Sequence, residues 1–91
     1  MKKMKLSLYV LEDYPSSKEA IACIEKILES LPRNSYDFEI IDMLKNPEKT
    51  ESDNILVAPT LIKRSPLPFK KLVGSFNDSA RIIKELNIDG N

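Results

Sequence analysis

Cys23 is the side chain with the strongest nucleophilic potential in this sequence, and its surroundings favour a structural role. The chain of 91 residues contains one cysteine and no histidine. One cysteine cannot form an intramolecular disulfide, and without histidine the common zinc sites and the Cys-His or Ser-His catalytic pairs are absent. No neighbouring residue would stabilise a thiolate, so we predict that Cys23 is a small core residue near the apolar stripe of a helix.

Acidic neighbours and glycines add little further chemistry. Glu12 and Asp13 could form paired carboxylates or a metal site, but adjacent acids in a polar loop are more often simply solvated. Gly74 and Gly90 are the only glycines, which excludes a glycine-rich phosphate loop. The sequence therefore predicts no catalytic residue, no metal and no cofactor.

Basic residues surround a stiff, proline-rich connector in the second half of the chain. The connector is Ser65-Pro66-Leu67-Pro68, and its basic neighbours are Lys63, Arg64, Lys70 and Lys71. Such a group forms either a cationic face for a partner or the solvated edge of a hairpin. The residues alone leave both interpretations open.

The composition is that of an ordinary soluble domain, with 42% hydrophobic and 31% charged residues. The length suits a single domain that spans residues 1–91. Fourteen basic and fourteen acidic residues give a formal net charge of zero, so no overall field attracts nucleic acid or an anionic membrane. Apolar runs are too short for a membrane span and the start is unlike a signal peptide, so we expect a cytoplasmic protein.

The first half of the chain predicts a strand, a helix and a second strand. Lys5–Leu11 alternates and then becomes continuously apolar, which is typical of a central strand covered on both faces. Apolar residues then recur at helical spacing up to Leu31, and Pro32 stops the helix. Tyr36–Asp42 alternates again, as a half-buried strand does. Together these elements predict a βαβ unit with parallel strands.

Polar residues mark the expected ends of two helices. Ser16 or Ser17 would cap the first helix, and Glu19 stands at the capping-box distance from Ser16. The last helix is predicted over Asp78–Asp89, where no glycine interrupts the pattern.

The proline-rich middle predicts a short helix over Pro47–Asn54 and a hairpin of Leu61–Lys63 with Lys71–Val73. Pro59 donates no ladder hydrogen bond, so it must stand at the start or edge of a strand or in a turn. Spacing alone favours a trans peptide before Pro59, with cis as the alternative. Gly74 terminates the second hairpin strand.

The complete order βαβαββα is the thioredoxin topology: an α/β fold with a four-stranded mixed sheet and helices on both faces. A thioredoxin-like oxidoreductase needs a reactive cysteine between the first strand and the first helix. That turn reads Glu12-Asp13-Tyr14-Pro15-Ser16-Ser17. Disulfide exchange is therefore not available to this chain.

The block from Ile41 to Gly74 is similar to a known family. The residues that carry the likeness are Ile41-Asp42-Met43-Leu44-Lys45-Asn46-Pro47, Asp53, Ile55-Leu56, Ala58-Pro59-Thr60-Leu61, Lys63, Pro66, Pro68, Lys70-Lys71 and Gly74. With the Leu6–Val10 strand and Pro15, they resemble the circadian clock protein KaiB family, and the likeness continues without gaps to about Leu86.

The resemblance implies a non-enzymatic regulator that binds the ring of the hexameric clock ATPase KaiC, with other clock proteins as further partners. In the family, the bound form has the thioredoxin-like fold. The free form is commonly a tetramer whose second half adopts a different arrangement of strands and helices, the KaiB ground-state fold. The resemblance therefore also implies a homo-oligomer, a dimer or a tetramer.

The resemblance also implies where a partner would bind. The partner-binding candidates are Lys63, Lys70, Lys71, Pro68 and Lys18. The residues given structural roles are Asp42, Pro59 and Gly74. The exposed edge strand Tyr36–Ile41 would offer a further protein-binding surface.

Two departures from the family pattern affect these expectations. A basic residue usual in the first helical turn is Glu19 here, with Lys18 beside it, and a charge of the wrong sign weakens an interface. Glu85 and Asn87 replace a glycine and an aspartate in the last segment. Loss of a helix-interior glycine stabilises the helix, so we expect the chain to rest mainly in the thioredoxin-like state.

Two other functions remain as alternatives. One is a thioredoxin-fold redox or stress protein without a CxxC motif. The other is a detached sensory domain of the clock histidine kinase, which is a thioredoxin-like relative of the family.

Overall fold

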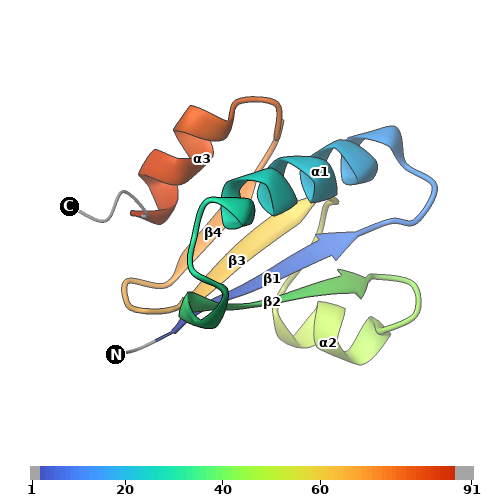
Figure 1. The fold of residues 1–91 in the computed structure, drawn as a ribbon. Coiled ribbons are helices and arrows are strands. Elements are labelled where there is room, and N and C mark those ends of the chain that lie inside the picture. The colour runs from blue at the N-terminus through green and yellow to red at the C-terminus, as the bar shows by residue number, and fades with distance from the viewer. Residues whose placement is uncertain (1–2, 88–91) are drawn as a thin grey trace.

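A computed structural model describes residues 3–87 and shows one sheet between helices (Figure 1). The predicted order βαβαββα is confirmed, with a turn of 3-10 helix added at Arg33–Ser35. The elements are β1 (Met4–Val10), α1 (Pro15–Glu29), β2 (Tyr36–Asp42), α2 (Pro47–Ser52), β3 (Thr60–Ser65), β4 (Lys70–Val73) and α3 (Ser79–Leu86).

The four strands lie in the order β2-β1-β3-β4, so β1 is central as predicted. β2 runs parallel to β1, whereas β3 and β4 form an antiparallel hairpin beside it. Tyr9 pairs with Thr60 at one end of the sheet, and Lys5 pairs with Ser65 at the other. The start of β3 therefore lies beside the carboxyl ends of β1 and β2, and the tip of the β3–β4 hairpin lies at the opposite end.

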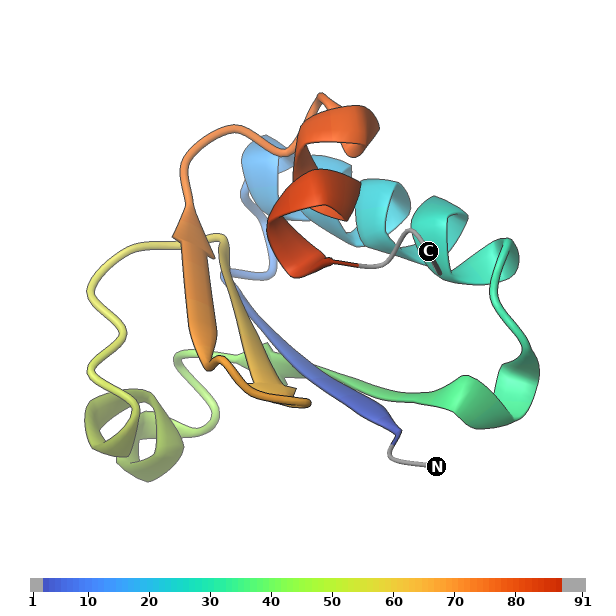
Figure 2. The same ribbon diagram turned by 90° about the vertical axis from the view of Figure 1, so that its left-hand side faces the viewer.

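Helices α1 and α3 cover one face of the sheet, and α2 lies against the other (Figures 1 and 2). Alternation along β1 explains this arrangement, because successive side chains point to opposite faces. Leu6 and Leu8 belong to the large core beneath α1 and α3, whereas Tyr9 belongs to a smaller cluster. The smaller cluster consists of Tyr9, Ile41, Ile55 and Ile62, with Met43 packed against it.

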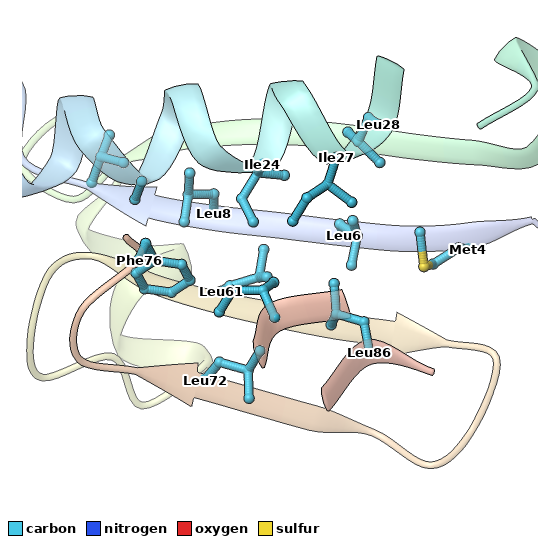
Figure 3. Close-up of a cluster of buried hydrophobic side chains, with 13 residues drawn as sticks. Met4, Leu6, Leu8, Ile24, Ile27, Leu28, Leu61, Leu72, Phe76 and Leu86 are labelled. Atoms are coloured by element: carbon cyan, nitrogen blue, oxygen red, sulfur yellow. The ribbon is translucent and has the colours of Figure 1, made fainter. Parts of the chain in front are cut away.

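The large core joins α1, α3 and three strands (Figure 3). Ile24 from α1, Leu61 from β3 and Ile82 from α3 are fully buried. Each such aliphatic side chain contributes about 2–5 kcal/mol when compared with alanine. Docking of α3 onto the hairpin therefore depends on the same apolar contacts that hold α1.

The predicted caps of α1 are wrong. The helix begins at Pro15, and its N-cap residue Tyr14 makes no side-chain hydrogen bond. Proline suits the first helical position because its missing amide needs no partner there, so the helix starts before Ser16. Ser17 is buried in the first turn, where its Oγ accepts a hydrogen bond from the Leu11 amide at 3.0 Å.

Residues with predicted structural roles stand at the ends of strands. Asp42 ends β2, and its Oδ1 accepts hydrogen bonds from the amides of Leu44 and Lys45 at 2.8 and 3.2 Å. Gly74 follows β4 with φ of 101°, a conformation that favours glycine. Pro59 stands directly before β3, in agreement with the predicted start of a strand, and it is buried. The favoured trans peptide is wrong, because the Ala58–Pro59 bond is cis. A cis peptide bond is less costly before proline than before any other residue, because the trans form is only slightly favoured there.

Helix α3 begins as predicted and ends earlier. The Asp78 side chain accepts a hydrogen bond from the Arg81 amide at 3.2 Å. Asn87 adopts the left-handed conformation, with φ of 61°, and so ends the helix after Leu86. Asparagine tolerates this conformation better than most residues. The remainder of the predicted helix, at residues 88 and 89, lies outside the described residues.

No helix in the part of the chain from residue 3 to residue 87 is long and apolar enough to cross a membrane.

We expect the free protein to occupy the thioredoxin-like arrangement, and we expect Glu85→Gly to weaken α3 by about 1 kcal/mol. NMR chemical shifts of the wild type should be helical for Ser79–Leu86 and extended for Thr60–Ser65. Glu85→Ala, which keeps the helix propensity, should have the smaller effect on the stability of α3. A wild-type majority with helical shifts in Thr60–Ser65 would contradict this expectation.

Candidate functional site

The structure buries Lys63, which both interpretations of the hairpin, a cationic face or a solvated edge, had placed in solvent. Its side chain is only 2% exposed beneath α3, and its Nζ donates a hydrogen bond to the Leu86 carbonyl at 3.4 Å. Alternation along β3 places Lys63 on the same covered face as Leu61. The ammonium group therefore neutralises the C-terminal end of α3, and the predicted exposed position is wrong for this structure.

Other basic residues of the hairpin are separated from one another. Lys70 lies on the α3 side, with its Nζ 4.0 Å from Glu85 Oε2. Lys71 points to the opposite face, where its Nζ donates to the Asp53 carbonyl at 2.8 Å. Pro68 is exposed at the hairpin tip. The sequence-predicted residues therefore do not form one continuous patch.

Lys18 lies at the other end of the molecule from the hairpin tip. It lines a hollow of about 280 Å³ between α1 and β2, beside Ile21 and Ile40. The adjacent acid Glu12 is paired with Lys45, whose Nζ is 3.4 Å from Glu12 Oε2. No group of acidic, cysteine and histidine side chains within residues 3–87 is placed to hold a metal ion.

Cys23 packs against the large core from α1, as predicted. Burial raises the pKa of its thiol, and the nearby Asp78 carboxylate raises it further. A raised pKa keeps the thiol protonated and unreactive at neutral pH.

The most extensive polar contact joins the end of α2 to the sheet. Arg64 of β3 donates to both carboxylate oxygens of Asp53, with Nη2–Oδ2 at 2.6 Å and Nη1–Oδ1 at 3.4 Å. The Tyr9 hydroxyl of β1 donates to the same carboxylate at 2.5 Å. Two strands are thereby tied to the residue that directly follows α2.

These contacts change the acidity of the groups involved. The Arg64 guanidinium is the main cause that lowers the pKa of Asp53, and the Tyr9 hydrogen bond acts in the same direction. Burial raises the pKa of Tyr9 to about 12, and the Asp53 carboxylate adds to the shift. The charged Asp53 and the neutral Tyr9 are therefore the forms that the fold stabilises.

The polar contact continues along the sheet away from α2. Arg64 Nε donates to Ser7 Oγ at 3.0 Å, and Ser7 Oγ donates to Glu39 Oε2 at 2.8 Å. Beside these groups lies a hollow of about 260 Å³ that Lys5 and Asp37 also line. α2 is too short to cover this half of the face.

A second feature is the group of exposed apolar side chains around the carboxyl ends of β1 and β2, here called the carboxyl-end surface. Leu56 is 89% exposed and Leu44 is 80% exposed, and Tyr14 and Val57 are more than half exposed. They come from three loops: β1–α1, β2–α2 and α2–β3. Crevices outside the carboxyl ends of strands are common binding sites in α/β folds.

Two adjoining hollows shape the carboxyl-end surface. The larger, of about 530 Å³, is lined by side chains that include Leu44, Glu51 and Leu56. The smaller, of about 400 Å³, is lined by residues from Leu11 to Tyr14 and also by Leu44. They share Leu11 and Leu44, so they adjoin, and together they are called the depression.

Comparison with known proteins decides the family. The family model for the KaiB domain matches residues 7–88. The chain is also 39% identical over 83 residues to the circadian clock oscillator protein KaiB of Prochlorococcus marinus strain MIT 9313, covering 91% of this chain and 70% of that protein. The chain belongs to the KaiB family. The family predicted from the residues between Ile41 and Gly74 is therefore confirmed.

Solved structures show the fold of this KaiB-family chain. The N-terminal domain of Synechococcus elongatus SasA has a TM-score of 0.74 and 20% identity, covering all of this chain and 90% of that one. Thioredoxin from Trypanosoma brucei brucei has a TM-score of 0.78 and 17% identity, covering 99% of this chain and 78% of that one. The predicted thioredoxin-like fold is confirmed.

Sequence reasoning missed the Tyr9–Asp53–Arg64 contact and the carboxyl-end surface. Arg64 was considered only as one of several hairpin cations. A signal for the contact existed in the alternation of β3, which places Arg64 on the α2 face, two residues beyond the buried Ile62. The apolar Leu56 and Val57 follow a polar helix and precede a proline, which indicates a loop more than a core strand.

We expect the Tyr9 contact to make the protein sensitive to alkaline pH. Because the pKa of Tyr9 rises from about 10 to about 12 on folding, its contribution is complete below pH 10 and is lost as pH rises toward 12. The loss should reach at most about 3 kcal/mol, because each unit of pKa change corresponds to about 1.4 kcal/mol. Urea unfolding at about pH 8 and pH 11 should show a steeper decline for wild type than for Tyr9→Phe, and equal declines would contradict the role of Tyr9.

Proposed function

We propose that this KaiB-family chain is a non-enzymatic clock regulator that docks on a KaiC-like hexameric ATPase and modulates its phosphorylation and ATPase cycle. The observation that carries the proposal is the carboxyl-end surface. Large apolar side chains are exposed there on three neighbouring loops, with Leu44 and Leu56 at least 80% in solvent. Burial of such a side chain against a partner contributes about 1.5–3 kcal/mol.

The rigidity of this surface supports docking. The α2–β3 loop that carries Leu56 is held at its start by Asp53, which Arg64 and Lys71 both bind. At its end, Thr60 Oγ1 donates to the Val57 carbonyl at 2.7 Å. A preorganised loop loses less conformational entropy when a partner binds.

The partner-binding candidates from the sequence analysis contribute less to this proposed docking than the carboxyl-end surface does. Lys18 borders the carboxyl-end surface. Lys70, Lys71 and Pro68 lie toward the hairpin and give a separate contact with the ATPase ring. Lys63 contributes through α3, which its buried ammonium stabilises, and not by touching the partner in this conformation.

The outer edge of β2 supplies a second kind of contact. β2 pairs with β1 on one side only, and Ile40 is 45% exposed on it. An unpaired edge can accept a strand from another protein. We therefore include a further clock protein among the proposed partners. We also propose that the chain forms a dimer or a tetramer and that it acts in the cytoplasm.

A binding assay with a purified KaiC-like ATPase tests the docking. Leu56→Asp should weaken the affinity by at least about tenfold, because it places a charge in an apolar contact. Lys70→Glu should weaken it less. Leu67→Asp should also weaken it less, since Leu67 is 81% exposed at the hairpin tip, where the separate contact lies. Ala22→Asp is the matched control, because Ala22 is exposed on α1 and lines neither hollow. Absence of binding by wild type would overturn the ATPase partner, and loss of binding by Leu67→Asp alone would exclude the carboxyl-end surface.

A thioredoxin-fold redox or stress protein is the rival function, because the fold is shared with thioredoxins. The β1–α1 turn lacks a cysteine, and Cys23 sits in the middle of α1 with a raised pKa. We therefore expect disulfide reduction no faster than that of Cys23→Ser in an insulin-reduction assay. Faster reduction by wild type would establish thiol chemistry.

A detached sensory domain of a clock histidine kinase is the other alternative. The likeness to SasA, at 20% identity, concerns the fold. The ATPase-binding assay cannot separate the two on its own, whereas sedimentation of the free protein as a tetramer would favour the KaiB-type regulator.

A further inference from the structure

The carboxyl-end surface has a charge pattern that restricts its partner. Its two hollows are lined by four acids, Glu12, Asp13, Asp42 and Glu51, and by one base, Lys45. Their formal charge is therefore −3, although the whole chain is neutral. Including Lys18 from the neighbouring hollow still leaves −2.

Two of these charges neutralise each other within the protein, and the others remain. Lys45 is paired with Glu12 at 3.4 Å. The Asp42 carboxylate accepts two amide hydrogen bonds at the end of β2. Among residues 3–87, Asp13 and Glu51 form no ion pair. Asp42 also forms no ion pair and keeps its charge, but two amides bind its carboxylate. Asp13 and Glu51 are therefore the two acids of the surface whose carboxylates have neither an ion pair nor an amide donor within residues 3–87.

One of these two carboxylates lines each hollow of the depression, beside apolar side chains. Asp13 is adjacent to Tyr14 in the smaller hollow, and Glu51 lines the larger hollow together with Leu56. Leu44 lines both hollows. A ligand that fills the depression therefore meets apolar side chains and a carboxylate in each hollow.

Resting on the proposed function, we propose that the carboxyl-end surface binds a protein segment whose apolar ridge is flanked by lysine or arginine. An acidic rim attracts such a segment and repels one flanked by acids. The cognate ATPase surface is therefore cationic around its apolar contact. An amphipathic helix has the required form, because its apolar side chains lie on one face with cations beside them.

A pair of synthetic peptides provides the first probe. Both are amphipathic helices of about four turns with leucine on one face. One peptide carries lysine beside the leucines, and the other carries glutamate at the same positions. The lysine peptide should bind at least about tenfold more tightly, and it should shift amide resonances of Leu11–Tyr14 and Leu44. Equal binding, or shifts confined to the hairpin, would overturn the proposal.

Two doubly substituted proteins separate local from overall charge. Asp13→Lys with Glu51→Lys reverses the charge at one position in each hollow, whereas Glu25→Lys with Glu29→Lys makes the same net change on exposed positions of α1. The first pair should weaken binding of the lysine peptide by at least about tenfold and the second by less than about twofold. Similar losses in both would show nonspecific attraction and overturn the local site.

The same variants distinguish this inference from the proposed function. If a KaiC-like ATPase binds wild type and the Asp13→Lys, Glu51→Lys protein equally well, docking stands and the charge preference is wrong. If no such ATPase binds but the lysine peptide does so selectively, the charge preference stands and the ATPase partner is wrong. Concentration-dependent dimers that Leu56→Asp abolishes and that exclude the lysine peptide would show a second copy on this surface and overturn the proposal.

Discussion

The contact between Arg64 and Asp53 is the constraint on which the arrangement of the α2 face depends. α2 has only six residues and no buried side chain of its own, so packing alone holds it weakly. The guanidinium and the Tyr9 hydroxyl fix the carboxylate that follows the helix, and Ile55 then enters the small core. A charge-assisted hydrogen bond has a preferred geometry, so it fixes the position of the end of α2 more closely than a small apolar cluster does.

Fixing α2 at this point also determines what remains exposed. The helix covers the half of the sheet near Tyr9 and leaves the Lys5–Ser7 half open beside Glu39. Immediately after Asp53 the chain must return to β3, and it carries Leu56 and Val57 into solvent on the way. The same contact that stabilises the fold therefore positions the apolar loop beside Leu44 and Tyr14.

Much of this fold could be predicted from the sequence, because its elements follow strong local patterns. Tyr36–Asp42 is the strand that alternation indicated, and Asp78 caps the last helix. The predicted caps of α1 were wrong because the helix begins at Pro15 without a hydrogen bond from a capping side chain. The prediction that Lys63 is exposed was wrong because α3 packs over the face of β3 that carries this side chain, and the pattern of β3 alone does not indicate that contact. The carboxyl-end surface consists of three loops that are separated in the sequence, and local periodicity does not show which loops lie side by side in the fold.

In thioredoxin-like enzymes, the end of the sheet where α1 begins must supply a reactive thiol. Here that position carries Pro15 and two serines, so the chemical constraint on the surrounding loops is absent. Exposed Leu44 and Leu56 would be costly on a surface that stays in water, because isolated domains rarely keep such groups of apolar side chains without a partner. Their exposure beside the carboxylates of Asp13 and Glu51 therefore favours the docking that we propose over a surface that stays in water.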